Sequence, residues 1–136
     1  MKKIILEILI IFLLVGSVYA ANPVDIFKAP AGMQPAGNTG YADGQGHNII
    51  IVDYNNYDTW FKNDSDKYLV EKFNDTVYTG VTDENDVYLL EIVEKDNAKY
   101  IIQSWSPKGV SETQIIQKNL EEFNKINQLT PLPIEG

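Results

Sequence analysis

The chain has 136 residues, a formal net charge of −8 and 11 basic residues, every one of which is lysine. An acidic surface without arginine repels phosphate backbones and lacks the bidentate group that grips phosphates and bases, so we expect no nucleic-acid partner. The chain has no cysteine, which excludes disulfides, thiolate metal sites and thiol catalysis.

The first 20 residues have the layout of a secretory signal peptide. Two lysines precede an apolar stretch, residues 4–15, that only Glu7 interrupts. Val18 and Ala20 then place small residues three and one positions before a cut. The apolar run is shorter than the about 20 residues of a spanning helix. We therefore expect residues 1–20 to be removed and the protein to be secreted or held at the cell surface, without a stable membrane span. An uncleaved N-terminal membrane anchor is the alternative.

Residues 21–47 read as a short helix and a loop that lead into the main domain. Asn22 can cap a helix and Pro23 suits its first position, which predicts a helix of about one turn. Residues 31–46 contain five glycines and no apolar periodicity. This stretch is interpreted as a mobile loop or an irregular first strand around Met33.

The main domain comprises residues 48–136. Strand patterns dominate it as far as residue 105. The continuous β-branched run at 49–52 predicts a strand that is buried on both faces and therefore central. Residues 55–75 are ambiguous, because a helix capped near Ser65 and an alternating strand both fit the pattern. Three further strands are expected at 76–81, 87–93 and 98–105, with a hairpin turn at 94–97 between the last two.

The closing element is an amphipathic helix. Ser111 and Gln114 form a capping box, which predicts its start. At 100° per residue, the apolar positions share one half of the helix surface: Ile115, Ile116, Leu120, Phe123, Ile126 and Leu129. A one-sided helix after a series of antiparallel strands should lie across one face of the sheet. The prediction is an α+β domain with an antiparallel sheet of about four to six strands and this C-terminal helix on one face.

Catalytic and metal-binding signatures are weak. His47 is the single histidine, and no serine stands in a Gly-x-Ser-x-Gly motif, so a strand-entry role is favoured over catalysis. One histidine without cysteine predicts no zinc site, and the acidic turns lack the spacing of a calcium loop. We expect no catalytic residue, no metal and no cofactor. A small hydrolase that uses paired carboxylates is the alternative.

The stretch "YNNYDTWF" is the most suggestive ligand-binding signal. Tyr54, Tyr57 and Trp60 stand beside asparagine and aspartate side chains, the combination with which proteins bind sugars. The same rings pack well in a core, and the core interpretation is favoured because Tyr54 continues a strand. Tyr54, Tyr57 and Trp60 are nevertheless the candidate ligand-binding residues, with carbohydrate as the candidate ligand.

Two Asn-x-Ser/Thr sequences match the acceptor pattern for N-glycosylation. They begin at Asn63 and Asn74, and both fall in expected surface turns of an exported chain. About one match is expected by chance in a chain of this composition, so two matches are hardly more than chance. Asn63 and Asn74 are kept as candidate glycosylation sites.

The chain combines the signal segment with the residues Phe27 to Met33, the acidic lysine-only strands and the closing "LEEFNKINQL" helix. In this combination it resembles small exported proteins of unknown function from methanogenic archaea. The order of elements is also similar to the PsbP/Mog1-like sandwich, which is an architectural likeness and implies no functional residue.

The sequence favours a non-enzymatic domain that binds a partner at the cell surface or outside the cell. The expected partner belongs to the envelope or the surrounding medium, with carbohydrate as one candidate. A structural subunit of the cell envelope is a further alternative.

Overall fold

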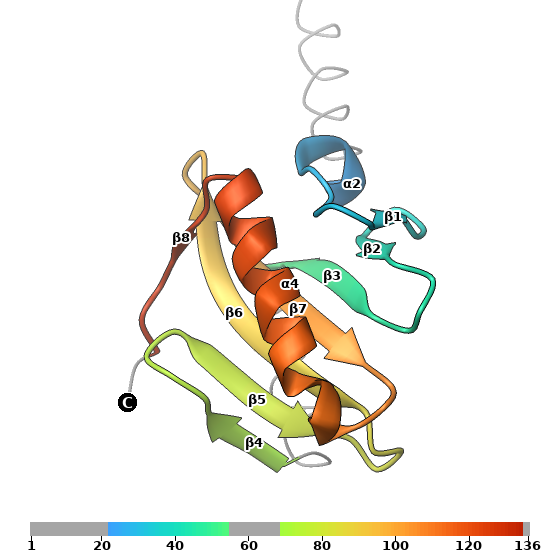
Figure 1. Ribbon diagram of the computed structural model, residues 1–136. Helices are drawn as coiled ribbons and strands as arrows, with labels where there is room; N and C mark the ends of the chain where they lie inside the picture. The colour runs from blue at the N-terminus through green and yellow to red at the C-terminus, as the bar shows by residue number, and fades with distance from the viewer. Residues whose placement is uncertain (1–21, 55–68, 135–136) are drawn as a thin grey trace, which may run out of the picture.

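The computed structural model describes residues 22–54 and 69–134 (Figure 1). In these residues one antiparallel sheet carries a helix across one face, which confirms the α+β prediction. The elements are α2 (Pro23–Ile26), β1 (Gln34–Pro35), β2 (Gly40–Ala42), β3 (Asn48–Asp53), β4 (Leu69–Lys72), β5 (Val77–Val81), β6 (Val87–Lys95), β7 (Ala98–Ser106), the 3-10 helix η2 (Val110–Glu112), α4 (Thr113–Ile126) and β8 (Thr130–Pro131). The strand order is β1-β2-β3-β7-β6-β5-β4, and β8 pairs with β6.

The β6–β7 hairpin is the centre of the sheet, and it forms where the sequence predicts it. Asp96 and Asn97 make the two-residue turn with φ values of 52° and 68°. Both values are left-handed, the backbone that a tight hairpin requires and that these residue types tolerate. Alternation along the two strands then divides their side chains between the helix-covered face and the opposite face.

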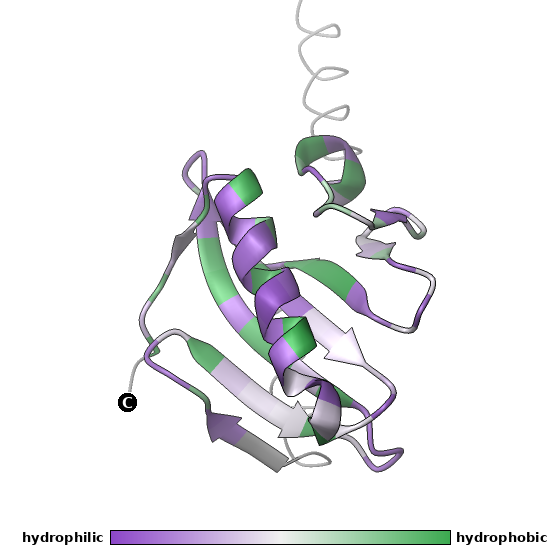
Figure 2. Cartoon of the chain, in the orientation of Figure 1, coloured by the Kyte–Doolittle hydropathy of each residue, from purple (hydrophilic) through white to green (hydrophobic). Residues whose placement is uncertain are grey.

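Helix α4 buries its apolar side against the sheet. Ile116, Leu120 and Phe123 are almost completely buried, and Figure 2 shows that the exposed side of α4 is mostly hydrophilic. The Phe123 ring lies 5.5 Å from the Phe27 ring, between their centroids. Burial of such side chains, at about 1.5–3 kcal/mol each, is the main force that holds the helix on the sheet.

The predicted capping box is wrong. Ser111 lies within η2, and α4 begins at Thr113 with Glu112 at its N-cap position and no side-chain capping bond. Gly109, with a φ of 88°, turns the chain into a 3-10 turn before the helix starts. The Glu112 carboxylate instead contacts His47.

The prediction for residues 49–52 is confirmed for the inner position of the strand and wrong for its burial on both faces. Strand β3 lies between β2 and β7 and is therefore directly next to the β6–β7 centre of the sheet. Ile49 and Ile51 are buried against α4, whereas Ile50 and Val52 are only partly buried. Both faces of the strand are apolar, but only one of them faces the fully packed layer.

The segment before residue 48 contributes to the same sheet and core. Phe27, Met33 and Tyr41 are buried with the α4 side chains, and β1 and β2 extend the sheet. The described residues thus contain an eight-stranded sheet instead of the expected four to six strands. Strand β1 directly follows Met33, where the sequence allows an irregular first strand, whereas β2 and β8 were not predicted because strands of three and two residues contain no apolar alternation.

The ends of the described chain are joined through Asn127, which is buried. Its side-chain oxygen accepts a 2.7 Å hydrogen bond from Lys28 N, and its amide nitrogen donates to Lys28 O at 2.9 Å.

The described part of the chain contains no helix with the length and apolarity needed to cross a membrane.

In residues 69–72, where a helix and a strand both fitted the sequence, the chain forms strand β4.

Candidate functional site: a cleft at Glu91

Two short strands share one edge of β6, and the sheet opens between them. Strand β5 pairs with β6 as far as Glu91, which lies opposite Val77. Strand β8 takes over at Val93, which lies opposite Pro131. Because neither strand continues past its neighbour, this edge is interrupted next to the Glu91 side chain, which points toward α4.

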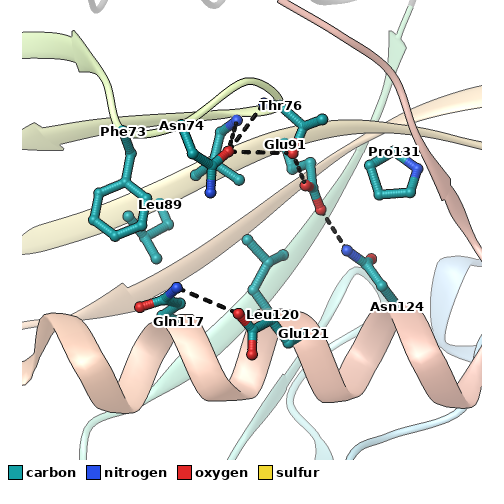
Figure 3. Close-up of a pocket in the computed structure, with 11 residues that line it drawn as sticks. Phe73, Asn74, Thr76, Leu89, Glu91, Gln117, Leu120, Glu121, Asn124 and Pro131 are labelled. Carbon is teal, nitrogen blue, oxygen red and sulfur yellow. Dashed lines mark hydrogen bonds between the residues drawn. The ribbon is translucent and has the colours of Figure 1, made fainter.

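A cleft of about 280 Å³ lies at this interruption. One wall comes from the turn before β5, and the other comes from α4 (Figure 3). Leu89 and Leu120 supply apolar surface between the walls. We call this site the Glu91 cleft and define it by six of its lining residues: Phe73, Asn74, Glu91, Gln117, Glu121 and Asn124.

Glu91 links the two walls. Its side chain is 4% exposed, and its Oε2 accepts a 2.6 Å hydrogen bond from Thr76 Oγ1. Its Oε1 accepts a short hydrogen bond from Asn124 Nδ2 on the helix. Burial raises the pKa of Glu91, and the nearby charge of Glu121 adds to the rise, although the two hydrogen bonds oppose it.

The rim of the cleft combines one aromatic ring with amide and carboxylate groups. Phe73 is 37% exposed, and Asn74 and Glu121 are exposed. Gln117 Nε2 donates to Glu121 Oε1 at 3.3 Å across one turn of α4. These groups can stack on an apolar ring face and can donate to or accept from hydroxyl groups. The cleft therefore has the chemical character that the sequence predicts for Tyr54, Tyr57 and Trp60.

The predicted aromatic site is only partly described. Tyr54 lies on the face of the sheet opposite α4, partly buried against a cluster formed by Tyr88, Leu90 and Ile101. Lys99 Nζ lies 5.2 Å from the centroid of its ring. Tyr57 and Trp60 lie outside the described residues. The structure thus places Tyr54 away from the Glu91 cleft, and the three-residue site stays a prediction.

Of the two candidate glycosylation sites, Asn74 lies on the rim of the cleft, in the exposed turn between β4 and β5. Asn63 lies outside the described residues.

His47 lies in a second polar cluster, where it is buried between two carboxylates. Its Nδ1 is 2.6 Å from Asp43 Oδ2 and its Nε2 is 3.0 Å from Glu112 Oε1. Burial alone would raise the pKa of Asp43, but hydrogen bonds from Gln45 and His47 lower it. Because both ring nitrogens face carboxylates, His47 joins the loop before β3 to the start of α4. Within residues 22–54 and 69–134, no group of three or more metal-ligating side chains could hold a metal ion.

Sequence reasoning missed the residues that form the cleft. One signal was available, because Val87, Leu89, Glu91 and Val93 alternate along "VYLLEIV" and share one face of β6. A single carboxylate on an otherwise apolar face points to a buried polar site. Its partners Thr76 and Asn124 lie 15 and 33 residues away, and no local pattern marks them.

No protein family, characterised protein or solved structure was found to match the chain. The resemblance to exported archaeal proteins stays a prediction.

Proposed function

We propose that the protein is an exported, non-enzymatic domain that binds a small hydroxylated ligand, with carbohydrate as the favoured class, in the Glu91 cleft. The observation that carries this proposal is the exposed ring of Phe73 beside the amide and carboxylate groups of the rim. Export is supported by the signal-peptide layout of residues 1–20. The protein would then act at the cell surface or in the surrounding medium.

The chemistry of the cleft suits such a ligand. An apolar ring face would pack on Phe73 and on the leucine side chains between the walls. Asn74, Gln117 and Glu121 would bond the hydroxyls, since amides donate and accept while a carboxylate accepts. A volume of about 280 Å³ lies near the lower end of the range for ligand pockets, which fits one sugar ring better than a long chain.

The test is a binding screen of mono- and disaccharides against the unglycosylated protein, monitored by saturation-transfer NMR and titration. Phe73→Ala should weaken the binding of a sugar found in the screen by about three- to tenfold, because it removes an aromatic contact. Ile115→Ala is the matched control, since Ile115 is also exposed, at 41%, but does not line the cleft. Equal affinities for the two variants, or no bound sugar, would contradict the proposal.

Hydrolysis by paired carboxylates is the second candidate function, because Glu91 and Glu121 line the same cleft. We favour binding, since Glu91 is 4% exposed and each of its oxygens already accepts a hydrogen bond. A carboxyl group that is buried and hydrogen-bonded through both oxygens helps to form the wall of the cleft but is badly placed to contact a glycosidic bond. Release of reducing sugar from a bound disaccharide, abolished by Glu121→Gln, would favour the hydrolase.

A further inference from the structure

The sequence Asn74-Asp75-Thr76 places a glycan acceptor motif on the rim of the Glu91 cleft. We propose that Asn74 carries an N-linked glycan and that the first sugar of this glycan closes the cleft to free ligands. The inference rests on the proposed function in two respects, export and ligand binding in the cleft. It adds a modification site and a means of regulating that binding.

The two polar atoms of the Asn74 side chain have different roles. Its Oδ1 accepts hydrogen bonds from Thr76 N at 2.9 Å and from Val77 N at 3.0 Å, and the Thr76 hydroxyl lies 3.3 Å away. These contacts hold the turn that leads into β5. Its Nδ2 makes no hydrogen bond to the described residues and points from the turn toward the α4 side of the cleft (Figure 3). Nδ2 is the atom that N-glycosylation uses.

Glycosylation at this atom leaves the turn intact. Nδ2 attacks C1 of a sugar that is activated as a glycosyl diphosphate, so that a C–N bond forms while the C–O bond to the diphosphate breaks. The amide loses one proton and the diphosphate leaves. Oδ1 remains a carbonyl oxygen, so the contacts with residues 76 and 77 are kept. The side chain of the neighbouring Asp75 is 99% exposed, which places this turn at the surface, where a transferase can reach it.

A sugar on Nδ2 occupies the same space as a free ligand. Asn74 forms one wall of the cleft, and Gln117 and Glu121 face it from α4. The linkage places the first sugar ring next to Phe73, with its hydroxyls within reach of the helix. Because the cleft holds about 280 Å³, one bound ring leaves no room for a second.

The attachment test uses the full chain, secreted from a host that attaches N-glycans. Peptide mass mapping before and after enzymatic deglycosylation, which turns a glycosylated asparagine into aspartate, identifies each occupied site. We expect a glycan on Asn74 in a background that carries Asn63→Asp. Asn74→Asp is the matched control, because it keeps the acceptor oxygen, whereas Thr76→Ala would also remove the hydrogen bond to Glu91. An unmodified Asn74 would overturn the inference.

The closure test exploits the absence of cysteine from the natural chain. A thiol introduced by Gln117→Cys reports access to the cleft, and one introduced by Ile115→Cys reports access to α4 outside it. We expect the glycan to slow labelling at position 117 by about tenfold relative to Asn74→Asp, with no change at position 115. Enzymatic removal of the glycan should restore the rate. An unchanged rate at position 117 would overturn the closure.

The experiments distinguish a failure of ligand binding in the Glu91 cleft from a failure of the Asn74 glycan to close it. Thiol labelling needs no free ligand, so its outcome stands even when the sugar screen finds no binding. Conversely, a sugar that binds the unglycosylated chain supports the cleft even when Asn74 proves unmodified. Where both hold, the glycosylated chain should not bind that sugar, and enzymatic removal of the glycan, which leaves aspartate at position 74, should restore the affinity measured for Asn74→Asp.

Discussion

The surroundings of two carboxyl groups, those of Glu91 and Asp43, shift their pKa values in opposite directions. Burial raises the pKa of Glu91 above its ordinary value of 4.5, so the fold disfavours its charged form. Hydrogen bonds from Gln45 and His47 lower the pKa of Asp43 below its ordinary value of 3.8, despite burial, so the fold favours its charged form. The two residues should therefore give opposite contributions to the pH dependence of the free energy of unfolding.

Glu91→Gln should stabilise the protein at neutral pH. The pKa of Glu91 is raised in the folded state. Its full contribution to the free energy of unfolding is therefore present below the pKa of the unfolded state, and this contribution is lost as pH rises through the pKa of the folded state. Glutamine keeps the shape and still accepts from Asn124, but it carries no charge. Urea unfolding near pH 4 and pH 7 should show the variant gaining stability, relative to wild type, only at the higher pH. A destabilised variant at neutral pH would contradict this explanation.

Asp43→Asn provides the contrast, with the opposite sign. The stability that Asp43 contributes is present above its unfolded pKa and is lost as pH falls through the lower folded pKa. The variant should be less stable than wild type at neutral pH, and the difference should shrink on acidification in the same urea series. A difference that grows toward low pH would show that the hydrogen bonds from Gln45 and His47 do not favour the charged form.

Single residues were the hardest level to predict from the sequence. The sequence predicts His47 at the entry to a strand, and His47 directly precedes β3, but its contact with Glu112 spans 65 positions and has no local signature. Glu91 stood out only by its place in an alternating strand. In both cases the partner is set by how distant elements pack, which composition and periodicity do not specify.

At the level of elements, the long periodic segments were predictable. Strands β5, β6 and β7 and the apolar side of α4 follow alternation and 3.6-residue periodicity, because each buries one face against the same core. The short strands β2 and β8 were not, since two or three residues form a strand only when a neighbour is already in place. The start of α4 was missed because Gly109 and His47 determine the preceding turn.

Phe123→Ala should cost about 3–5 kcal/mol of unfolding free energy, because it leaves a cavity between α4, Phe27 and Tyr41. Lys118→Ala, on the exposed side of the same helix, should change stability by less than about 0.5 kcal/mol. Urea unfolding of both variants checks the difference. Glu122 is a poorer control, since its Oε1 accepts a hydrogen bond from Ala31 N at 3.1 Å. Similar small effects for Phe123→Ala and Lys118→Ala would contradict the observed packing.

At the level of the whole molecule, the exported form should begin at Ala21. The small residues at Val18 and Ala20 fit a signal-peptidase cut between positions 20 and 21. Intact-mass measurement of protein recovered from the medium and from the envelope checks this directly. A chain that still begins at Met1 would identify residues 1–20 as a membrane anchor and would place the α+β domain at the membrane surface.

The general architecture was predictable from the sequence, but the cleft was not. An antiparallel sheet with one amphipathic helix follows from the pattern of the strands and of α4. The cleft arises because β5 and β8, which are separated by more than 40 positions, stop on the same edge of β6. Such an interruption depends on strand register, which a single sequence leaves open wherever strands are short.

The bonds between Lys28 and Asn127 have a consequence for when this chain can fold. They join residues 99 positions apart, and Phe27 reaches its place in the core only against a helix near the end of the chain. Contacts of such high sequence separation form late, since a long loop must close before they give any stabilisation. Synthesis therefore has to reach Asn127 before the core is complete. If the chain is exported, as we propose, it would cross a narrow translocation channel unfolded and form the Glu91 cleft only afterwards.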